Sequence, residues 1–206
     1  GWVDCEMKNG TSSIIKRNGV IAALDIGTTK VCCLIAKVRP ERAGGGPSII
    51  GIGHQISNGL RNGAIVDLDR AEASVRATVE AAEQMAGENI DKVIVNLNGG
   101  QRKSRLLAYE VSIGGHEIGS SDIRRILDPT NFSQQELETH ELVHRIPIGY
   151  GVDGNRGIAD PRGMFADTLS VNLHVVTALR GQLRNLRTVV RRCHLGIEEI
   201  IVSPYA

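Results

Sequence analysis

The sequence lacks the features that would assign it to several large classes of protein. Its 24 Lys and Arg residues nearly balance its 23 Asp and Glu residues, for a formal net charge of +1, which argues against a general binder of polyanions such as nucleic acid. No apolar run approaches the roughly 20 residues that cross a bilayer. We therefore expect a soluble, cytoplasmic polypeptide without a signal peptide.

Cysteine is also scarce, with four residues in the chain. Cys32 and Cys33 are adjacent in an apolar run, where the alternation of a strand points them to opposite faces. This pattern is typical of reduced, buried thiols and not of a disulfide framework. We expect one of the pair to be buried as a small apolar side chain and both to be unreactive.

At 206 residues, the chain is long enough for one domain or two small ones. Its apolar content of 41% is sufficient to build a hydrophobic core. Residues 1–17 are polar and aperiodic, so we interpret them as a flexible tail or a leader foreign to the fold. A strand-like run at residues 200–202 lies close to the last residue. We therefore expect the chain to be a fragment.

The most informative segment is a pair of apolar runs, residues 20–24 and 31–35, that flank Asp-Ile-Gly-Thr-Thr-Lys. This pattern predicts a β-hairpin with a carboxylate at the end of its first strand. The glycine lets the loop backbone approach an anion, and successive amides, two hydroxyls and a lysine can then bind phosphate. The candidate nucleotide phosphate-binding residues are Asp25, Gly27, Thr28, Thr29 and Lys30, with Asp25 holding Mg²⁺ through water.

Periodicity predicts the remaining elements. Alternating apolar residues predict an opening three-stranded meander, and a 3.6-residue period then predicts an amphipathic helix capped by Asp67. The turn dipeptide Asn98-Gly99 predicts a hairpin, and residues 120–122 can cap a short helix. The predicted strands are residues 20–25, 31–38, 49–56, 93–97, 106–113, 142–150, 169–175 and 199–202, and the predicted helices are residues 67–86, 120–127 and 180–194.

The order of these elements predicts an α/β fold interrupted by a compact α+β insert. We expect a tail at residues 1–17 and the first part of the main fold at 18–89. The insert is expected at 90–173, because short strands and a short helix replace the opening pattern there. The opening layout then returns at 174–206.

Several motifs, in order, resemble the FtsA family of bacterial cell-division proteins, in an alphaproteobacterial-like form. They include Leu-Asp-Ile-Gly-Thr-Thr-Lys-Val, Ile-Ile-Gly-Ile-Gly-His-Gln and Gly-Leu-Arg-Asn-Gly-Ala-Ile-Val-Asp-Leu-Asp. The resemblance continues to the final Ser-Pro-Tyr-Ala and covers about residues 18–206. It implies an actin-like, ribonuclease H-like subdomain 1A with an inserted SHS2-type subdomain 1C.

The resemblance also implies a function. FtsA proteins bind ATP with Mg²⁺, associate into actin-like filaments, and tether FtsZ at the cytoplasmic side of the inner membrane at the division site. Their subdomain 1C receives later division proteins such as FtsN. The resemblance matches Asp25, Gly27, Thr28, Thr29 and Lys30 to the first phosphate loop, and it assigns no catalytic residue.

The same resemblance implies that much of the family's machinery lies beyond residue 206, including the second phosphate loop and a C-terminal amphipathic membrane helix. We therefore expect this piece to bind ATP weakly or not at all and to bind no membrane. Any ATPase activity would be weak and would belong to the full-length protein. Protein–protein contact through the insert is the function that this piece is expected to retain.

Other interpretations stay open at several positions. The Asp-Ile-Gly-Thr-Thr-Lys segment is also compatible with an ordinary hairpin turn. Arg102, Lys103 and Arg105 form a basic cluster that suits either a partner contact or protection of a sheet edge against aggregation. His140 and His144 have the spacing of metal ligands on a helix, but we expect them to be solvent-facing because no carboxylate or cysteine partner is evident.

Two other functions would use the same hairpin. A sugar kinase of this superfamily needs a catalytic carboxylate facing a sugar pocket, and no candidate base is apparent. An actin-fold ATPase of pilus assembly, PilM-like, shares the insert but differs in the segment at residues 59–69.

Overall fold

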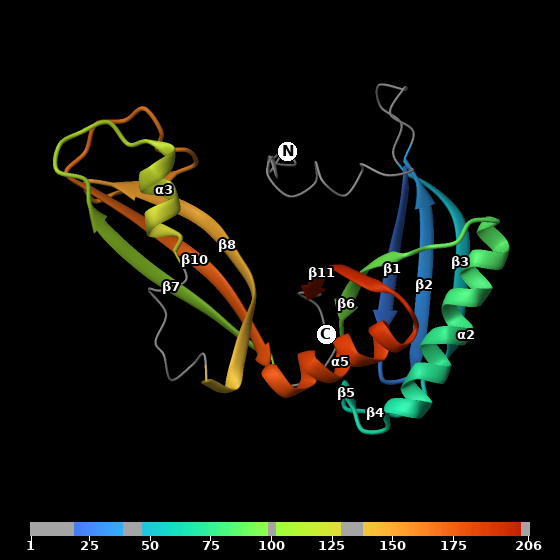
Figure 1. The fold of residues 1–206 in the computed structure, drawn as a ribbon. Coiled ribbons are helices and arrows are strands. Elements are labelled where there is room, and N and C mark those ends of the chain that lie inside the picture. Colours follow the sequence, from blue (N-terminus) through green and yellow to red (C-terminus); the bar gives the residue numbers. More distant parts are fainter. Residues whose placement is uncertain (1–18, 39–46, 99–101, 129–137, 203–206) are drawn as a thin grey trace. The chain divides into compact units, whose positions relative to one another are not determined.

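The computed structural model describes residues 19–38, 47–98, 102–128 and 138–202 (Figure 1). Two compact units divide the chain: the first is Gly1–Gly100 with Gln182–Ala206, and the second is Gln101–Gly181. Each unit has its own sheet and is treated by itself below. The predicted tail, Gly99 of the predicted turn and the final Ser-Pro-Tyr-Ala lie outside the described residues.

The first unit is built on a five-stranded sheet in the order β11-β6-β1-β2-β3. Its first three strands form the predicted antiparallel meander, while β6 runs parallel to β1 and β11 runs parallel to β6. The five strands are β1 (Val20–Ile26), β2 (Lys30–Lys37), β3 (Ser48–Ile56), β6 (Lys92–Leu97) and β11 (Gly196–Val202).

The position of β6 corrects two predictions. Residues 93–97 do not form a hairpin with residues 106–113, because β6 lies between β1 and β11, and β7 (Arg102–Ser112) belongs to the other sheet. The second unit therefore begins near residue 101 and ends near residue 181, not at 90 and 173. The local turn signal at Asn98-Gly99 was misleading because the partners of β6 are distant in sequence.

Helix α2 (Leu68–Ala86) covers one face of this sheet, with most of its contacts to β3 and β2 (Figure 1). The predicted cap is confirmed: the Asp67 carboxylate accepts hydrogen bonds from the backbone amides of Asp69 and Arg70. The helix lies so close to β3 that a Cβ on Gly53 would collide with the Thr78 carbonyl. Backbone therefore packs directly against backbone at this point.

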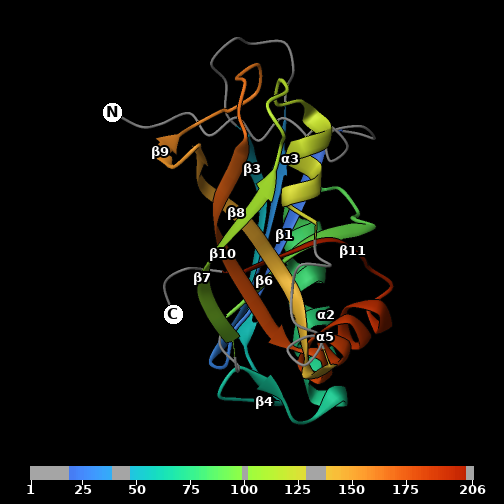
Figure 2. The same cartoon turned by 90° about the vertical axis from the view of Figure 1, so that its left-hand side faces the viewer.

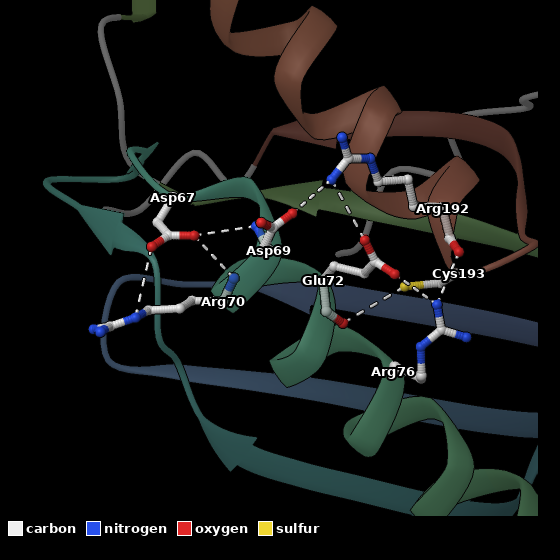
Figure 3. A network of polar contacts seen from close by, with 7 residues as sticks. All are labelled: Asp67, Asp69, Arg70, Glu72, Arg76, Arg192 and Cys193. Carbon is white, nitrogen blue, oxygen red and sulfur yellow. Dashed lines mark hydrogen bonds and ion pairs between the residues drawn. The ribbon is translucent and has the colours of Figure 1, made fainter.

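Helix α5 (Arg180–Arg192) buries a stripe of apolar residues, and a polar network joins its end to α2 (Figure 3). The Arg192 guanidinium lies 3.0 Å from the Asp69 carboxylate and 3.6 Å from that of Glu72. Arg76 donates to Glu72 at 2.7 Å and to the Arg192 carbonyl at 3.0 Å. The Cys193 thiol donates to the Glu72 carbonyl, so the two helices are held side by side at these ends.

A small hairpin of β4 (Leu60–Arg61) and β5 (Ala64–Ile65) precedes α2. Its two turn residues, Asn62 and Gly63, both have positive φ, at 49° and 74°. Asn-Gly is the pair that a tight turn of this kind favours, since both residues tolerate the left-handed region. Asn62 and Gly63 therefore favour the tight turn between β4 and β5.

The second unit is an antiparallel four-stranded sheet in the order β7-β10-β8-β9, with helix α3 (Ser120–Ile126) beside it (Figure 2). Leu169, Val171, Leu173 and Val175, alternating along the central β10, form the middle of its core. Helix α3 packs against β7 and β10. The remaining elements are β8 (His140–Val152), β9 (Asn155–Ile158) and β10 (Thr168–Leu179).

The cap of α3 differs from the prediction. The N-cap residue is Gly119, which offers no side chain, and Asp122 instead reaches back so that its carboxylate accepts from the Gly119 amide at 3.0 Å. Within the described ranges, no helix is both long enough and apolar enough to cross a bilayer.

Candidate functional site

The predicted phosphate loop forms the turn between β1 and β2. The Gly27 amide donates to the Lys30 carbonyl at 3.0 Å and closes the turn. Gly27 does not have positive φ; instead, an added Cβ would lie 3.0 Å from that carbonyl oxygen. The Gly27 amide is therefore used within the turn, and Thr28, Thr29 and Lys30 are the exposed residues of the loop.

The turn is supported by the segment that follows β3. The Gly63 amide, in the β4–β5 turn, donates to the Thr28 hydroxyl oxygen at 2.8 Å. The Ser57 amide donates to the Thr29 carbonyl at 3.1 Å. Two hydrogen bonds from this segment thus hold the loop, and Thr28 keeps its own hydroxyl proton for another acceptor.

Asp25, the last residue but one of β1, is half-buried and lies between strands on both sides. It is opposite Cys32 on β2 and opposite Asn96 on β6. Its Oδ1 atom accepts from the side-chain amides of Asn98 at 2.5 Å and Asn96 at 3.3 Å. Burial raises the pKa of the Asp25 carboxyl, while the two amides and the nearby Lys30 ammonium act in the opposite direction.

Asn96 and Asn98 are therefore part of the site, although they were not predicted. A signal was present in the sequence: an asparagine interrupts the apolar run at residues 93–97, and a second one follows two positions later, directly after the end of β6. The Oδ1 atom of Asn96 is buried and has no hydrogen-bond partner among the described residues.

These oxygens fit a hydrated Mg²⁺ ion. Mg²⁺ prefers oxygen ligands and keeps several of its waters, so it needs acceptors for water protons as well as a carboxylate. Asp25 supplies the carboxylate, and the unpartnered Asn96 oxygen is an acceptor on the residue directly opposite. Within the described residues, no cluster of three or more His, Cys, Asp or Glu side chains could hold a metal by itself.

The predicted basic cluster lies in the second unit, on β7, which is an edge strand. Arg102, Lys103 and Arg105 pair with Ala178, Thr177 and Val175 of β10. Lys103 and Arg105 are exposed and alternate onto the same face of β7, while Arg102 is half-buried on the other face. The cluster thus marks the start of an edge strand and not the turn of a hairpin.

Two other predictions concern single residues. His140 and His144 lie on strand β8, not on a helix, and His140 is only 8% exposed, so the expectation of two solvent-facing histidines is wrong. Cys33 is fully buried, as expected for one member of the pair, and burial raises the pKa of its thiol to about 12. A thiol with that pKa is almost entirely protonated, and hence unreactive, near neutral pH.

Comparison with known proteins first identifies the fold. A family model described as the SHS2 domain inserted in FTSA matches residues 99–177. The solved structure titled "PilM-PilN type IV pilus biogenesis complex" has a TM-score of 0.56 and 12% identity, covering 89% of this chain and 47% of that one. The fold is therefore the actin-like fold with an inserted SHS2 domain.

The relatives define the family more narrowly. Cell division protein FtsA of Rhizobium meliloti (strain 1021) is 42% identical over 199 residues, which is 93% of this chain and 45% of the relative. FtsA of Pseudomonas aeruginosa is 31% identical over 192 residues, again 93% of this chain and 45% of the relative. The chain is thus related to the FtsA proteins along nearly its whole length, which confirms the resemblance, and it spans about 45% of the length of these relatives.

Proposed function

We propose that this chain is part of an actin-like cell-division protein in which the first unit supplies one phosphate loop of an ATP site. The observation that carries the proposal is the geometry at the end of β1. There the Asp25 carboxylate is held by two amides beside a turn whose exposed residues are Thr28, Thr29 and Lys30. The FtsA relatives support the cell-division role.

Each loop residue has a role in this proposal. The amides and hydroxyls of Thr28 and Thr29 donate to phosphate oxygens, and the Lys30 ammonium contributes positive charge. Asp25 holds Mg²⁺ through water, and Mg²⁺ when bound neutralises phosphate charge. Gly27 permits the tight turn. No described residue is assigned as catalytic, so the proposal is a nucleotide-binding scaffold with at most weak ATPase activity in the longer protein.

We further propose that the second unit acts as the protein-interaction module. It corresponds to subdomain 1C, and the first unit to part of subdomain 1A. In the longer protein the partners would be FtsZ, further copies of the same protein and later division proteins such as FtsN, at the cytoplasmic side of the inner membrane. Exposed Lys103 and Arg105, with Arg102 beside them on an edge strand, are the proposed partner contact.

The PilM-like alternative is supported less well. The similarity to the PilM–PilN structure is one of fold, at 12% identity, whereas the relatives with 31–42% identity are named FtsA. A sugar kinase is not favoured by any feature of the described residues. A cell-division role therefore remains the better supported proposal.

Calorimetric titration with Mg-ATP tests the nucleotide site. We would compare this chain with one extended to the length of its relatives, and expect binding by the extended chain only. In the extended chain, Asp25→Ala should abolish or strongly weaken binding, while the matched control Asp91→Ala, at an exposed position in the same unit, should not. Tight binding by the short chain, or unchanged binding by Asp25→Ala, would contradict the proposed site.

Charge reversal tests the proposed partner contact. Replacing Lys103 and Arg105 with Glu should weaken binding to FtsN or to a second copy of the protein, measured by biolayer interferometry. The control is Arg156→Glu, an exposed arginine on β9 at the opposite edge of the same sheet. Equal binding by all variants would leave these charges with only a protective role at the sheet edge.

A further inference from the structure

We propose that Asn96 and Asn98 are positioning residues for Asp25, fixing the orientation in which its carboxylate receives the hydrated cation of a bound nucleotide. This inference rests on the proposed nucleotide-binding function and deepens it. The argument uses the strand register, the choice of carboxylate oxygen and the unpartnered oxygen of Asn96.

The strand register brings the three residues together. β1 and β6 are parallel neighbours, and Asp25 lies directly opposite Asn96. Asn98 directly follows the last residue of β6, and its side-chain amide donates to the same Asp25 oxygen as that of Asn96. The flanking Val93 and Val95 are buried in the core, which pins β6 and prevents a shift of register that would turn the asparagines away.

Both amides bind the same carboxylate oxygen. Asn98 and Asn96 each donate to Oδ1 of Asp25, and among the described residues Oδ2 accepts no hydrogen bond. Two donors on one oxygen restrict rotation of the carboxylate about its last torsion. The arrangement therefore selects which oxygen faces away from β6 and is available to a ligand.

The Asn96 side chain has a second polar atom in the site. Because its amide nitrogen is directed at Asp25, its Oδ1 atom must lie on the other side of the amide group, and that atom is buried without a partner. A buried acceptor without a partner is unfavourable and calls for a donor. A water molecule bound to Mg²⁺ is such a donor, so Asn96 has one atom for the carboxylate and one for the cation's water shell.

Residues that orient a metal ligand usually affect metal affinity about 10- to 100-fold when they are removed. Asn98→Ala in the extended chain should therefore weaken binding of Mg-ADP at least roughly tenfold. Binding of ADP in the presence of EDTA should change less than about twofold, since only the groups that hold the cation's water shell are disturbed. Asn96→Ala should behave in the same way, and Asn98→Gln, which keeps an amide donor, should restore part of the loss.

The control is Asn89→Ala, which removes an exposed asparagine from the same unit. Both titrations would be run by calorimetry on variants whose thermal unfolding midpoints match that of the unaltered protein. If Asn98→Ala fails that criterion, Asn96→Ala provides the same comparison. Loss confined to the Mg²⁺ titration supports the inference.

Two results would overturn the inference: equal weakening with and without Mg²⁺, which indicates a merely structural role, or no weakening in either titration. These results differ from failure of the proposed function itself. If the unaltered extended chain binds neither Mg-ADP nor ADP, the nucleotide site is wrong; if it binds both and the asparagine variants bind equally well, only the positioning role is wrong.

Discussion

The two units use their sheets in different ways. In the first unit, parallel and antiparallel neighbours meet at β1, and this places a carboxylate, two amides and a tight turn at the same end of the sheet. In the second unit, the described strands all pair antiparallel. Its exposed basic residues, Lys103 and Arg105, lie instead on one face of the edge strand β7. The difference suits a ligand site in one unit and a contact surface in the other.

The cores differ as well. The first unit brings backbone against backbone where α2 meets glycines of β3. The second unit relies on interlocking side chains along β10, with Leu173 only 1% exposed. A substitution that empties space at β10 should therefore be damaging in the second unit, and one that adds a methyl group at the α2–β3 contact should be damaging in the first.

Leu173→Ala is expected to have the largest effect on stability. It leaves a cavity in the core of the second unit and should lower the free energy of unfolding by roughly 3 kcal/mol. Hydrogen–deuterium exchange should accelerate in peptides of β7, β8 and β10 and not in those of β1 and β2. The control Leu106→Ala removes a leucine that is 70% exposed on the same sheet and should change stability by less than about 0.5 kcal/mol. Similar effects of the two substitutions would argue against a separate core.

Gly53→Ala should lower the free energy of unfolding by roughly 2 kcal/mol, because the added methyl group meets the Thr78 carbonyl and α2 must move. Urea denaturation followed by circular dichroism measures the change. Gly149→Ala is the matched control in the second unit, since an added Cβ there has no neighbour within 4 Å. If both glycines tolerate alanine, the helix is not packed against the strand backbone as described.

Asp67→Ala should cost about 1 kcal/mol, which is typical for the loss of a helix cap. Two backbone amides at the start of α2 would lose their acceptor. Thermal unfolding provides the measurement. Ser120→Ala serves as the comparison in the second unit, because the cap of α3 is Gly119 and no side chain caps that helix. A loss as large for Ser120→Ala as for Asp67→Ala would contradict the assignment of the two caps.

Glu72→Gln should have the smallest effect, and its size depends on pH. The Arg76 hydrogen bond lowers the pKa of the Glu72 carboxyl below its ordinary value of 4.5. A lowered carboxyl pKa stabilises the fold above pH 4.5, and the stabilisation is lost as pH falls through the pKa of the folded state. The unfolding midpoint of the variant should thus be slightly below that of the unaltered protein at pH 6.

The two midpoints should converge as the solution is acidified. Glu80→Gln, which alters an exposed glutamate on the same helix, is the matched control. Thermal unfolding between pH 3 and pH 7, about the range over which carboxylates titrate, covers the transition. A constant difference across this range would mean that the charge of Glu72 does not contribute through Arg76.

The strand pairings that could be predicted from sequence are those between strands that are close in the chain. The meander from β1 to β3 and helix α2 follow from local periodicity, and Asp67 as a cap needs only the next three residues. The parallel strand β6 could not be placed, because its neighbours β1 and β11 are remote in sequence. The Asn98-Gly99 dipeptide therefore favoured a hairpin that does not exist.

The same distinction applies to the site. Asp25 and the loop after it are contiguous, so motif and chemistry could be seen together in the sequence. Asn96 and Asn98 are separated from Asp25 by some seventy residues and contact it only because β6 pairs with β1. The support of Thr28 by Gly63 likewise depends on how a distant hairpin folds back. These contacts depend on how distant strands and hairpins pair, which the residue types alone do not reveal.

The close approach of α2 to β3 has a consequence for anyone redesigning this protein. The carbonyls of Ala82 and Thr78 occupy the space that a Cβ at Gly51 or Gly53 would need. A library that varies the surface of the first unit freely would still have to hold these two positions as glycine. Any new sequence designed for this backbone needs glycine at these two positions, whatever ligand or partner it is selected to bind.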